Sequence, residues 1–367
     1  MTRDHTFLRP ELATLAPYNA GLTVEEVARR PGVTRVAKLG SNENPLGPDP
    51  AVHQALETAL QNVAVYPDPS GRTLVAALAE RHGVAPEQFV LGNGSEDLLA
   101  VLARAVLRPG DRVVTLYPSF PLHEDYARLM GAKVTRIGLT DDGRIDVDAL
   151  VAAVAQPVRM VLFANPMNPA GVWLSPRDLD RVLDAVHPDA VTCLDEAYHE
   201  YADGDDYASG EARLASQPGP LLILRTFSKA WGLAGLRVGY GLTNNTDLKR
   251  GLDLARTPFN VNLMAQVAAK TALAHPQSVD EAVALVQQER PRMAAAIETL
   301  GLRVLPSKGN FLFFDCGRPS VDLAETLLDQ GVIIKPWKQP GYENWLRVSV
   351  GTPSDNDLFL AALATAL

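Results

Sequence analysis

A lysine follows a serine just beyond a short apolar run in the stretch TFSKAWGLAGLRVGY. The run LLIL at 221–224 is typical of a buried strand, so Lys229 stands close to the carboxyl end of that strand. A lysine there can stay exposed, bind a phosphate as a point charge, or form a Schiff base with a carbonyl compound. Its neighbours favour phosphate binding or a Schiff base over simple exposure, because Thr226 and Ser228 carry hydroxyl groups and Arg237 has a planar guanidinium that suits a phosphate.

Other polar residues match the remaining needs of an aldehyde cofactor. Pyridoxal phosphate, the best-known aldehyde cofactor with a phosphate, needs a lysine, an anion site and an acid opposite its pyridine nitrogen. Asp195 in CLDEAYHEY can be that acid, because a carboxylate at the end of an apolar strand is costly to bury unless a cation pairs with it. Tyr198 and Asn168 can donate to the phenolic oxygen of the ring. Considered separately, an Asp at this point often caps a helix, and an Asn between prolines marks a turn.

A sheet covered by helices is the architecture that must position these residues. From about residue 89 onward, short β-rich runs alternate with helical patterns, as in a mostly parallel sheet. The predicted strands are 89–92, 111–117, 159–164, 190–196 and 221–227. Such sheets bind ligands at the carboxyl ends of their strands, and Gly94, Ser95 and Glu96 follow the first strand where a helix is predicted to begin. Their backbone N–H groups can bind a phosphate, and a simple helix cap is the alternative.

The totals describe a globular chain of roughly two domains. Its 367 residues are 47% hydrophobic and 21% charged, which allows a sizeable core. The net charge of -9 disfavours a nucleic-acid partner, because phosphate binding needs clustered Lys and Arg. Cys193 and Cys316 lack the spacing of a zinc site, so we expect no metal and a reducing compartment. Residues 1–15 lack a signal-peptide core and no apolar run could cross a bilayer, so we expect a cytoplasmic protein without a membrane partner.

The order of these features along the chain resembles that of a known enzyme class. A glycine-rich turn, an aromatic residue, an asparagine, Asp-x-x-Tyr, Ser-Lys and an arginine recur in the fold type I pyridoxal-phosphate aminotransferases. Among these, the chain resembles the histidinol-phosphate aminotransferase family nearly from end to end. The motifs that carry the resemblance are LAPYNAG at 15–21, SNENPLGP at 41–48, YPDPSG at 66–71, GNGSEDLL at 92–99, NPMNPAG at 165–171, DEAYHEY at 195–201, TFSKAWGLAGLRVGY at 226–240 and LRVSVGT at 346–352.

The resemblance implies an α/β fold with a large and a small domain. The large, cofactor-binding domain would span 41–255 and contain a mostly parallel seven-stranded sheet covered by helices. The N-terminal arm at 1–40 and residues 256–367 would form the smaller α+β domain. The resemblance also implies a homodimer, in which Tyr66 of one subunit reaches the cofactor phosphate of the other.

By the same resemblance, Lys229 would bind pyridoxal 5'-phosphate as a Schiff base and move a proton between the substrate and the cofactor. Asp195 would pair with the pyridine nitrogen, and Asn168 and Tyr198 would bind the phenolic oxygen. Phe120 would stack on the ring, where the family usually has tyrosine. The other cofactor-binding residues, mostly around the phosphate, would be Gly94, Ser95, Glu96, Thr226, Ser228 and Arg237.

The resemblance implies four substrate-binding residues. Arg347 would receive the anionic group of each substrate, whether it is a phosphate or a carboxylate. Tyr18 and Asn42 would belong to an arm that closes over the substrate. Lys335 stands where many members of the family have arginine, so that the charge is kept but the bidentate fork is lost.

The first hypothesis for the function is transamination of L-histidinol phosphate with 2-oxoglutarate in histidine biosynthesis. Met167, Ala170 and Trp231 depart from the family pattern toward apolar and aromatic side chains. These departures favour, as an alternative, an aminotransferase that acts on aromatic amino acids. A third hypothesis is a pyridoxal-phosphate decarboxylase of a phosphorylated amino acid, which would share the same cofactor site.

Two hypotheses from other classes explain less of the sequence. A pyridoxal-phosphate sensor fused to a DNA-binding domain would need a basic helix-turn-helix segment before the site, and the sequence has none. A dinucleotide-binding oxidoreductase would need a third glycine after the G-x-G of GNGSEDLL. Neither hypothesis accounts for the Ser-Lys pair at 228–229.

Overall fold

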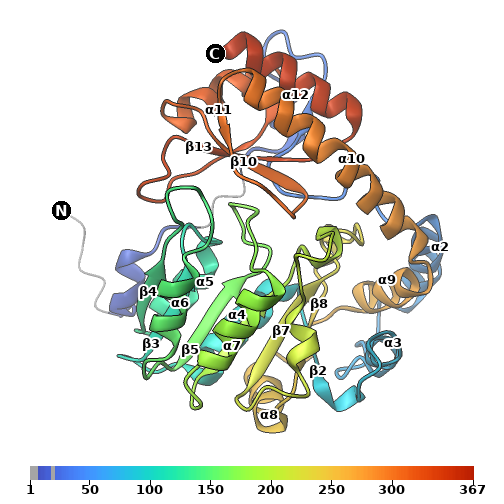
Figure 1. Cartoon of the computed structure of the whole chain (residues 1–367). Helices are drawn as coiled ribbons and strands as arrows, with labels where there is room; N and C mark the ends of the chain where they lie inside the picture. The colour runs from blue at the N-terminus through green and yellow to red at the C-terminus, as the bar shows by residue number, and fades with distance from the viewer. Residues whose placement is uncertain (1–6, 18–20) are drawn as a thin grey trace.

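A seven-stranded sheet forms the lower half of the molecule as drawn in Figure 1. The structure, a computed structural model, describes residues 7–17 and 21–367. Within them the strands are β2 (Phe89–Gly92), β3 (Arg112–Leu116), β4 (Lys133–Ile137), β5 (Met160–Ala164), β6 (Val191–Asp195), β7 (Leu221–Thr226) and β8 (Gly239–Thr243). Their order across the sheet is β2-β8-β7-β6-β5-β3-β4, with β8 antiparallel to β2 and β7 and the other pairs parallel. The predicted α/β fold with a mostly parallel sheet is confirmed.

Helices cover both faces of this sheet because successive strand residues point to opposite sides. The helices are α4 (Ser95–Val106), α5 (Pro121–Leu129), α6 (Val147–Val154), α7 (Pro176–Ala185) and α8 (Thr246–Ala255). In β6, Cys193 belongs to the apolar cluster that α4, α5 and α8 form on one face. The next residue, Leu194, belongs to the cluster that contains α6 and α7 on the other face. Ser175 caps α7 by accepting a hydrogen bond from the N–H of Asp178, as the sequence predicts.

A second, four-stranded sheet lies above the first in Figure 1 and is coloured orange to red. Its order is β12-β13-β10-β9, with bounds β9 (Arg303–Val304), β10 (Phe311–Asp315), β12 (Lys335–Pro336) and β13 (Trp345–Ser349). The long helix α10 (Gln277–Thr299) packs with α12 (Pro353–Ala366), which also contacts α11 (Ser320–Leu328). The result is a mixed α+β unit that faces the carboxyl ends of β6 and β7 (Figure 1).

The N-terminal part of the chain joins both units. β1 (Ala37–Lys38) pairs in parallel with β11 (Val332–Ile333) beside the second sheet. Farther along, α2 (Pro50–Ala59) and α3 (Arg72–His82) pack against α9 (Leu263–Ala274) next to the large sheet. The remaining helices are α1 (Val24–Ala28) and the 3-10 helices Pro10–Thr14, Leu60–Asn62, Pro86–Gln88, His199–Tyr201, Gly210–Arg213 and Ala234–Leu236. The domain limits at 41–255 and 256–367 stay a prediction.

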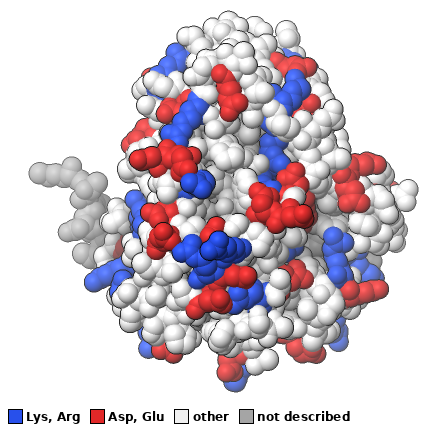
Figure 2. Space-filling model, viewed as in Figure 1, with Lys and Arg blue, Asp and Glu red and all other residues white. Residues whose placement is uncertain are grey.

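The surface drawn in Figure 2 carries acidic and basic side chains side by side over both units. Among residues 7–17 and 21–367, no helix is long and apolar enough to cross a membrane. In the same part of the chain, no three His, Cys, Asp or Glu side chains are grouped so that they could hold a metal ion.

Candidate active site

A cavity of about 430 Å³ lies where the carboxyl ends of β6 and β7 face the second sheet. Twelve of the residues predicted for the site line it: Ser95, Glu96, Phe120, Asn168, Asp195, Tyr198, Thr226, Ser228, Lys229, Arg237, Lys335 and Arg347. These residues come from separate segments of the chain, from α4 to β13, so the fold brings most of the predicted site together.

Lys229 lies in the turn after β7 and is partly buried in the cavity wall. Its Nζ donates a hydrogen bond of 2.9 Å to the carbonyl oxygen of Ser41. Burial, and then the neighbouring cation of Arg347, lower the pKa of the Lys229 amine to about 7. Much of this amine is therefore neutral near pH 7, and the neutral form is the one that attacks a carbonyl or accepts a proton from carbon.

Asp195 ends β6 with its carboxylate buried at the cavity. Its Oδ2 lies 2.9 Å from Nε2 of His123, and its Oδ1 accepts a hydrogen bond of 3.2 Å from the N–H of Ala197. His123 is 1% exposed, and its ring lies edge-on to that of Phe120, with 5.6 Å between the centroids. The carboxylate is thus held in one orientation, in which a cation inside the cavity can pair with it.

His123 was not among the residues predicted from the sequence. It lies in the first turn of α5, three positions after Phe120 and shortly after the end of β3. A position just after the end of a strand can mark a residue of a ligand site, but many other residues of the chain also have such a position. The contact with Asp195 joins α5 to β6 across 72 residues of sequence, and only the fold reveals it.

The hydroxyl group of Tyr198 accepts two hydrogen bonds from amide groups. Nδ2 of Asn168 lies at 3.1 Å and Nδ2 of Asn42 lies at 3.0 Å. Asn168 in turn accepts a hydrogen bond of 2.7 Å from Arg347, which also donates to the carbonyl oxygen of Gly40 at 2.8 Å. A continuous set of hydrogen bonds therefore connects the predicted substrate arginine with the predicted ligands of the cofactor ring.

Lys335 and Arg347 sit opposite each other on neighbouring strands of the second sheet. Burial, and then the charges of Arg347 and Lys338, lower the pKa of Lys335 to about 8. The guanidinium carbon of Arg347 lies 5.6 Å from the ring centre of Phe311 and 5.8 Å from that of Trp337. This wall of the cavity combines cations with aromatic faces, which suits an anion that carries a ring.

The start of α4 and the turn after β7 form a candidate phosphate site. In the described part of the chain no side chain caps α4, and its first residues line the cavity. Nη1 of Arg237 donates to Oγ of Ser228 at 3.3 Å, and Nη2 lies 3.9 Å from the carboxylate of Glu96. A methyl group on Gly94, whose φ is 85°, would come within 2.8 Å of Nη2 of Arg237. Glycine there leaves room for the guanidinium beside the uncapped N-terminus of α4.

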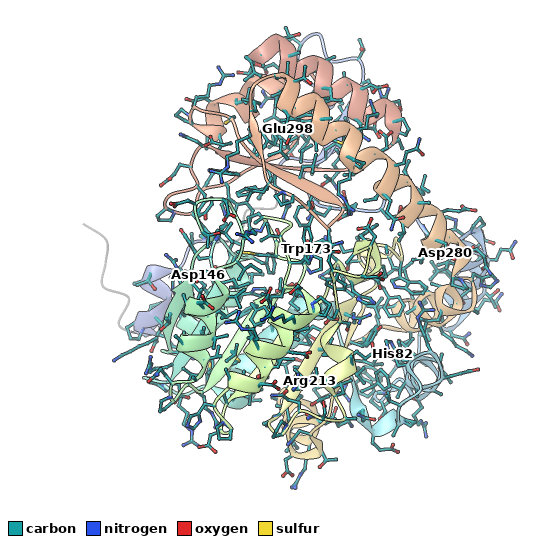
Figure 3. All side chains as sticks on the ribbon, in the orientation of Figure 1. His82, Asp146, Trp173, Arg213, Asp280 and Glu298 are labelled. Atoms are coloured by element: carbon teal, nitrogen blue, oxygen red, sulfur yellow. The ribbon has the colours of Figure 1, made fainter. Side chains whose placement is uncertain are left out.

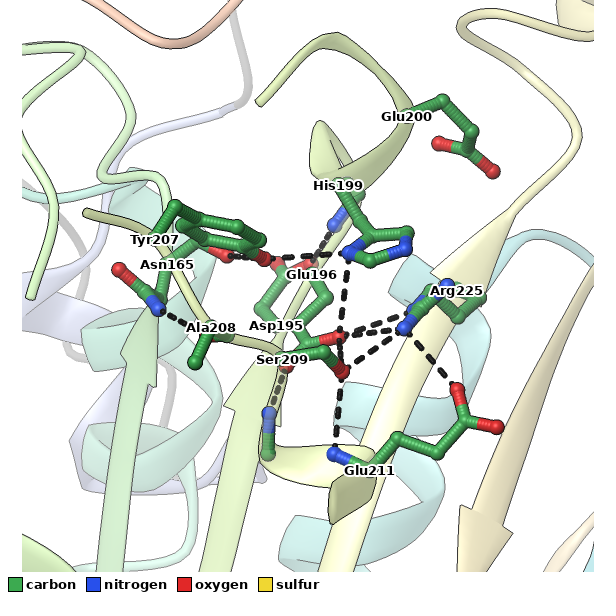
Figure 4. Close-up of polar contacts among 12 residues, drawn as sticks. Asn165, Asp195, Glu196, His199, Glu200, Tyr207, Ala208, Ser209, Glu211 and Arg225 are labelled. Atoms are coloured by element: carbon green, nitrogen blue, oxygen red, sulfur yellow. Dashed lines mark hydrogen bonds and ion pairs between the residues drawn. The ribbon is translucent and has the colours of Figure 1, made fainter. Parts of the chain in front are cut away.

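A buried group of charged side chains lies next to Asp195 at the ends of β6 and β7 (Figure 4). Arg225 of β7 lies 2.7 Å from Oε2 of Glu196 and 3.2 Å from Oε2 of Glu211. Glu196 directly follows Asp195 and also accepts hydrogen bonds from Ser209 Oγ and the N–H of Gly210, both at 2.7 Å. These bonds tie the backbone at the end of β6 to β7 and to the loop at 207–211, and the sequence alone did not reveal them.

Polar contacts also join the two sheets beside the cavity. Trp173, labelled between the two units in Figure 3, has Nζ of Lys308 4.6 Å above its ring centre. Lys308 precedes β10 and lies 2.7 Å from Asp206, which belongs to the loop after β6. The ion pair thus holds the second sheet over the carboxyl ends of the first.

Three other predicted residues, Gly94, Tyr66 and Asn42, are not among those that line the cavity. Tyr66 is 81% exposed and stacks on Phe259 with 4.5 Å between ring centres, so within this chain it is not part of the cavity wall. Asn42 is 1% exposed and lies behind Ser41, which does line the cavity. Tyr18 falls outside the described residues. The roles predicted for individual residues stay predictions.

Comparison with known proteins gives consistent results. Residues 34–363 match the family model of aminotransferase class I and II. The chain is 53% identical to histidinol-phosphate aminotransferase 1 of Mesorhizobium japonicum, with all of both chains covered. It is 52% identical to histidinol-phosphate aminotransferase 3 of Rhizobium meliloti, with 97% of this chain and 96% of the relative covered.

Two solved structures are relevant to the hypotheses. The crystal structure of histidinol-phosphate aminotransferase from Sinorhizobium meliloti in complex with pyridoxal-5'-phosphate matches with a TM-score of 0.87 and 30% identity, covering 100% of this chain and 98% of that one. L-threonine-O-3-phosphate decarboxylase from Porphyromonas gingivalis matches with a TM-score of 0.79 and 26% identity, covering 90% and 99%.

Proposed function

This chain belongs to the histidinol-phosphate aminotransferase family of class I and II aminotransferases, and on that basis we propose that it moves the amino group of L-histidinol phosphate to 2-oxoglutarate. The products are imidazole acetol phosphate and glutamate. The observation that carries the proposal is the position of Lys229, with its lowered pKa, in one cavity with the cations Lys335 and Arg347. A reactive amine beside two cations suits amino transfer between substrates that carry an anionic group.

The cofactor that we propose is pyridoxal 5'-phosphate, because the groups that line the cavity fit its parts. The uncapped start of α4 and the guanidinium of Arg237 suit the phosphate. The buried carboxylate of Asp195 suits a protonated pyridine nitrogen, and Tyr198 suits the phenolic oxygen. When bound, this cofactor withdraws electrons from the substrate's α-carbon so that the α-proton becomes acidic.

The residues of this chain would bind the substrates, orient the cofactor and transfer the proton. Arg347 would bind the phosphate of the donor or a carboxylate of the acceptor through its two-pronged guanidinium. Nζ of Lys229 would take the proton from the α-carbon and hold it for return. Asp195, oriented by His123, would present its carboxylate to the ring nitrogen. The same anion site would bind the amino donor in the first half-reaction and 2-oxoglutarate in the second.

A single half-reaction tests the proposed function. The cofactor-loaded protein is mixed separately with histidinol phosphate and with phenylalanine, and the loss of cofactor absorbance is followed. We expect fast conversion by histidinol phosphate alone, because the cation pair at Lys335 and Arg347 should recognise its phosphate. Comparable or preferential conversion by phenylalanine would contradict the proposal and favour the aromatic alternative.

One observation favours that second candidate, an aminotransferase of aromatic amino acids. A neighbouring cavity of about 650 Å³ shares Phe120, Lys335 and Arg347 with the first. Its wall is largely apolar and includes Trp337 and Leu328. An apolar cavity of this kind suits a phenyl ring as well as an imidazole ring. The half-reaction with phenylalanine therefore decides between the two amino donors.

Decarboxylation of a phosphorylated amino acid remains the third hypothesis. The similarity to L-threonine-O-3-phosphate decarboxylase concerns the shared fold, and the relatives at 53% and 52% identity are named aminotransferases. Incubation with a phosphorylated amino acid distinguishes the reactions, because a decarboxylase releases carbon dioxide and forms no keto product.

Replacing Arg347 with alanine should weaken the binding of both substrates. A hydrogen bond to a charged group contributes about 1.5–3 kcal/mol, so we expect the KM of histidinol phosphate and that of 2-oxoglutarate to rise by about 10- to 100-fold each. Steady-state kinetics with each substrate varied in turn measures this. Arg347→Lys, which keeps the charge but not the fork, should be intermediate. An effect on one substrate only would exclude the shared anion site.

We propose a homodimer in which Tyr66 completes the phosphate site of the partner. An exposed apolar patch, formed by Val63, Val65, Tyr66 and Phe259, supports this proposal, because such patches commonly mark interfaces. Sedimentation of the protein should give twice the mass of the chain. Tyr66→Phe should weaken cofactor binding, and a monomer with full cofactor affinity would contradict the proposal.

A further inference from the structure

Asp125 of α5 is a half-buried carboxylate in the wall of the cavity of about 650 Å³ beside the proposed active site. This side cavity shares Phe120, Lys335 and Arg347 with the first cavity. Most of its wall is apolar and comes from α5, α11 and the segment at 333–337. Asp125 was not among the residues predicted from the sequence, and a carboxylate in such a wall needs an explanation.

The carboxylate of Asp125 has no partner in the described part of the chain. Among residues 7–17 and 21–367 it accepts no hydrogen bond and forms no ion pair. Arg128, three positions along α5, donates to Glu124 instead, at 2.6 Å. Burial raises the pKa of the Asp125 carboxyl, and the charge of Arg128 offsets this only in part. Taking a carboxylate out of water without a partner costs free energy, which a donor on a bound ligand would recover.

The other acceptor side chains of this wall are already engaged. In the part of the chain that the structure describes, they are Glu325 and Gln339. The carboxylate of Glu325 lies 2.7 Å from Nη1 of Arg30. Oε1 of Gln339 accepts hydrogen bonds of 2.9 Å from Nε1 of Trp337 and of 3.0 Å from a backbone N–H. Asp125 is therefore the acceptor in this wall that is available to a ligand.

The charges of the two cavities suit a ligand with an anionic group at one end and a ring at the other. Lys335 and Arg347 line both cavities, and Lys229 lines the first. When the phosphate of the amino donor binds to these two cations and its amino group faces Lys229, its ring is left for the side cavity. An imidazole ring has an N–H donor, and with an ordinary pKa of about 6.5 it can also carry a positive charge. A phenyl ring offers neither.

We infer that Asp125 is a specificity-determining residue that accepts a hydrogen bond from the imidazole N–H of the amino donor and so selects imidazole over phenyl. This inference rests on the proposed function and deepens it. The apolar part of the wall would contact the faces of either ring. Asp125 would decide between them, because a phenyl ring would leave the desolvated carboxylate without a partner.

The test compares two amino donors that differ only in the ring, L-histidinol phosphate and L-phenylalaninol phosphate. Each is mixed with the cofactor-loaded protein, and kcat/KM of the first half-reaction is measured from the loss of cofactor absorbance. We expect a value about 10- to 100-fold higher for the imidazole donor, the effect of one hydrogen bond to a charged group. Asp125→Leu, which is similar in shape but apolar, should remove this preference by lowering the value for histidinol phosphate alone.

A conservative variant and a matched control make the comparison sharper. Asp125→Asn keeps the size and one acceptor oxygen but loses the charge, so its preference for imidazole should be intermediate. Asp322→Asn removes the same charge from α11, which also contributes to the wall, but Asp322 itself does not line the cavity. This control should keep the wild-type preference. The second half-reaction, with 2-oxoglutarate, involves no N–H donor on a ring, so Asp125→Leu should not slow it.

Thermal unfolding distinguishes ring selection from a structural role of Asp125. Because its carboxylate has no partner in the described residues, Asp125→Leu should leave the Tm of the ligand-free protein unchanged or raise it. A lower Tm together with equal losses for both donors would show that Asp125 supports the fold and does not select the ring. If Asp125→Leu does not fold, Asp125→Asn decides by its reduced preference.

The outcomes separate this inference from the proposed function. If the wild-type protein converts histidinol phosphate but no faster than phenylalaninol phosphate, the inference is wrong and the proposed function stands. The same holds if Asp125→Leu keeps the wild-type preference. If the wild-type protein converts neither donor, the proposed function fails, and the inference fails with it. A loss confined to the imidazole donor would confirm the role of Asp125.

Discussion

Lys229→Ala is expected to lower turnover by more than about 10⁴-fold, because it removes the covalent link to the cofactor and a general base that alone is worth about 10²–10⁴-fold. The fold and the cavity should persist, since among residues 7–17 and 21–367 the lysine side chain makes a single hydrogen bond, to the carbonyl of Ser41. Assays with a high enzyme concentration and a coupled glutamate readout can follow such a low rate.

Borohydride treatment identifies the lysine that carries the cofactor. Reduction of the wild-type protein should attach the cofactor to the peptide that contains Lys229, as measured by mass spectrometry. Lys335→Ala is the matched control, because Lys335 lines the same cavity and its pKa is also lowered, to about 8. This control should label normally. Attachment at Lys335, or normal labelling of Lys229→Ala at another site, would show that Lys229 has been assigned the wrong role.

Asp195→Asn should leave the cofactor bound and slow the half-reaction severely. Breaking a buried charge pair by removing one partner costs about 3–5 kcal/mol. If this loss falls on the transition state, the rate decreases by about 10²–10⁴-fold. The change conserves the size of the side chain, so cofactor absorbance should be retained. Stopped-flow measurement of the first half-reaction gives the rate directly.

The matched control for this change is Asp315→Asn. Asp315 also ends a strand, β10, but its Oδ1 accepts a hydrogen bond from the N–H of Gly317 and it does not line the cavity. Its replacement should leave the half-reaction unchanged. An unchanged rate in Asp195→Asn would refute the electronic role of Asp195, whereas loss of the cofactor would assign it to binding.

In the large sheet, the sequence pattern predicted the five strands that have continuous apolar runs and missed the other two. The predicted strands at 89–92 and 221–227 agree with β2 and β7 to within one residue. The stretch KVTRI of β4 lies at the edge of the sheet and is only partly buried, and GYGLT of β8 contains two glycines. Neither stretch has a continuous apolar run, and their places depend on pairing with distant strands.

The residues that line the cavity were largely predictable, because they follow strand ends in an order that the resemblance made recognisable. Residues that hold other side chains of the site in place could not be predicted in this way. His123 and Arg225 give no local signal, since a single histidine in a helix or an arginine in a strand is common. Their roles arise from contacts with Asp195 and Glu196, which only the packed fold creates.

The pairing of β1 with β11 has a consequence for how the protein is made. Residues 37–38 find their strand partners only at 332–333, and the hydrogen bond from Asn42 to Ser349 spans 307 residues of sequence. On the ribosome, the early segment must therefore wait until the last strands have emerged, which at about 5–20 residues per second takes tens of seconds. Until then its apolar residues Ala37 and Leu39 lack their final cover. A nascent chain that stalls late in synthesis would expose this segment to chaperones and proteases.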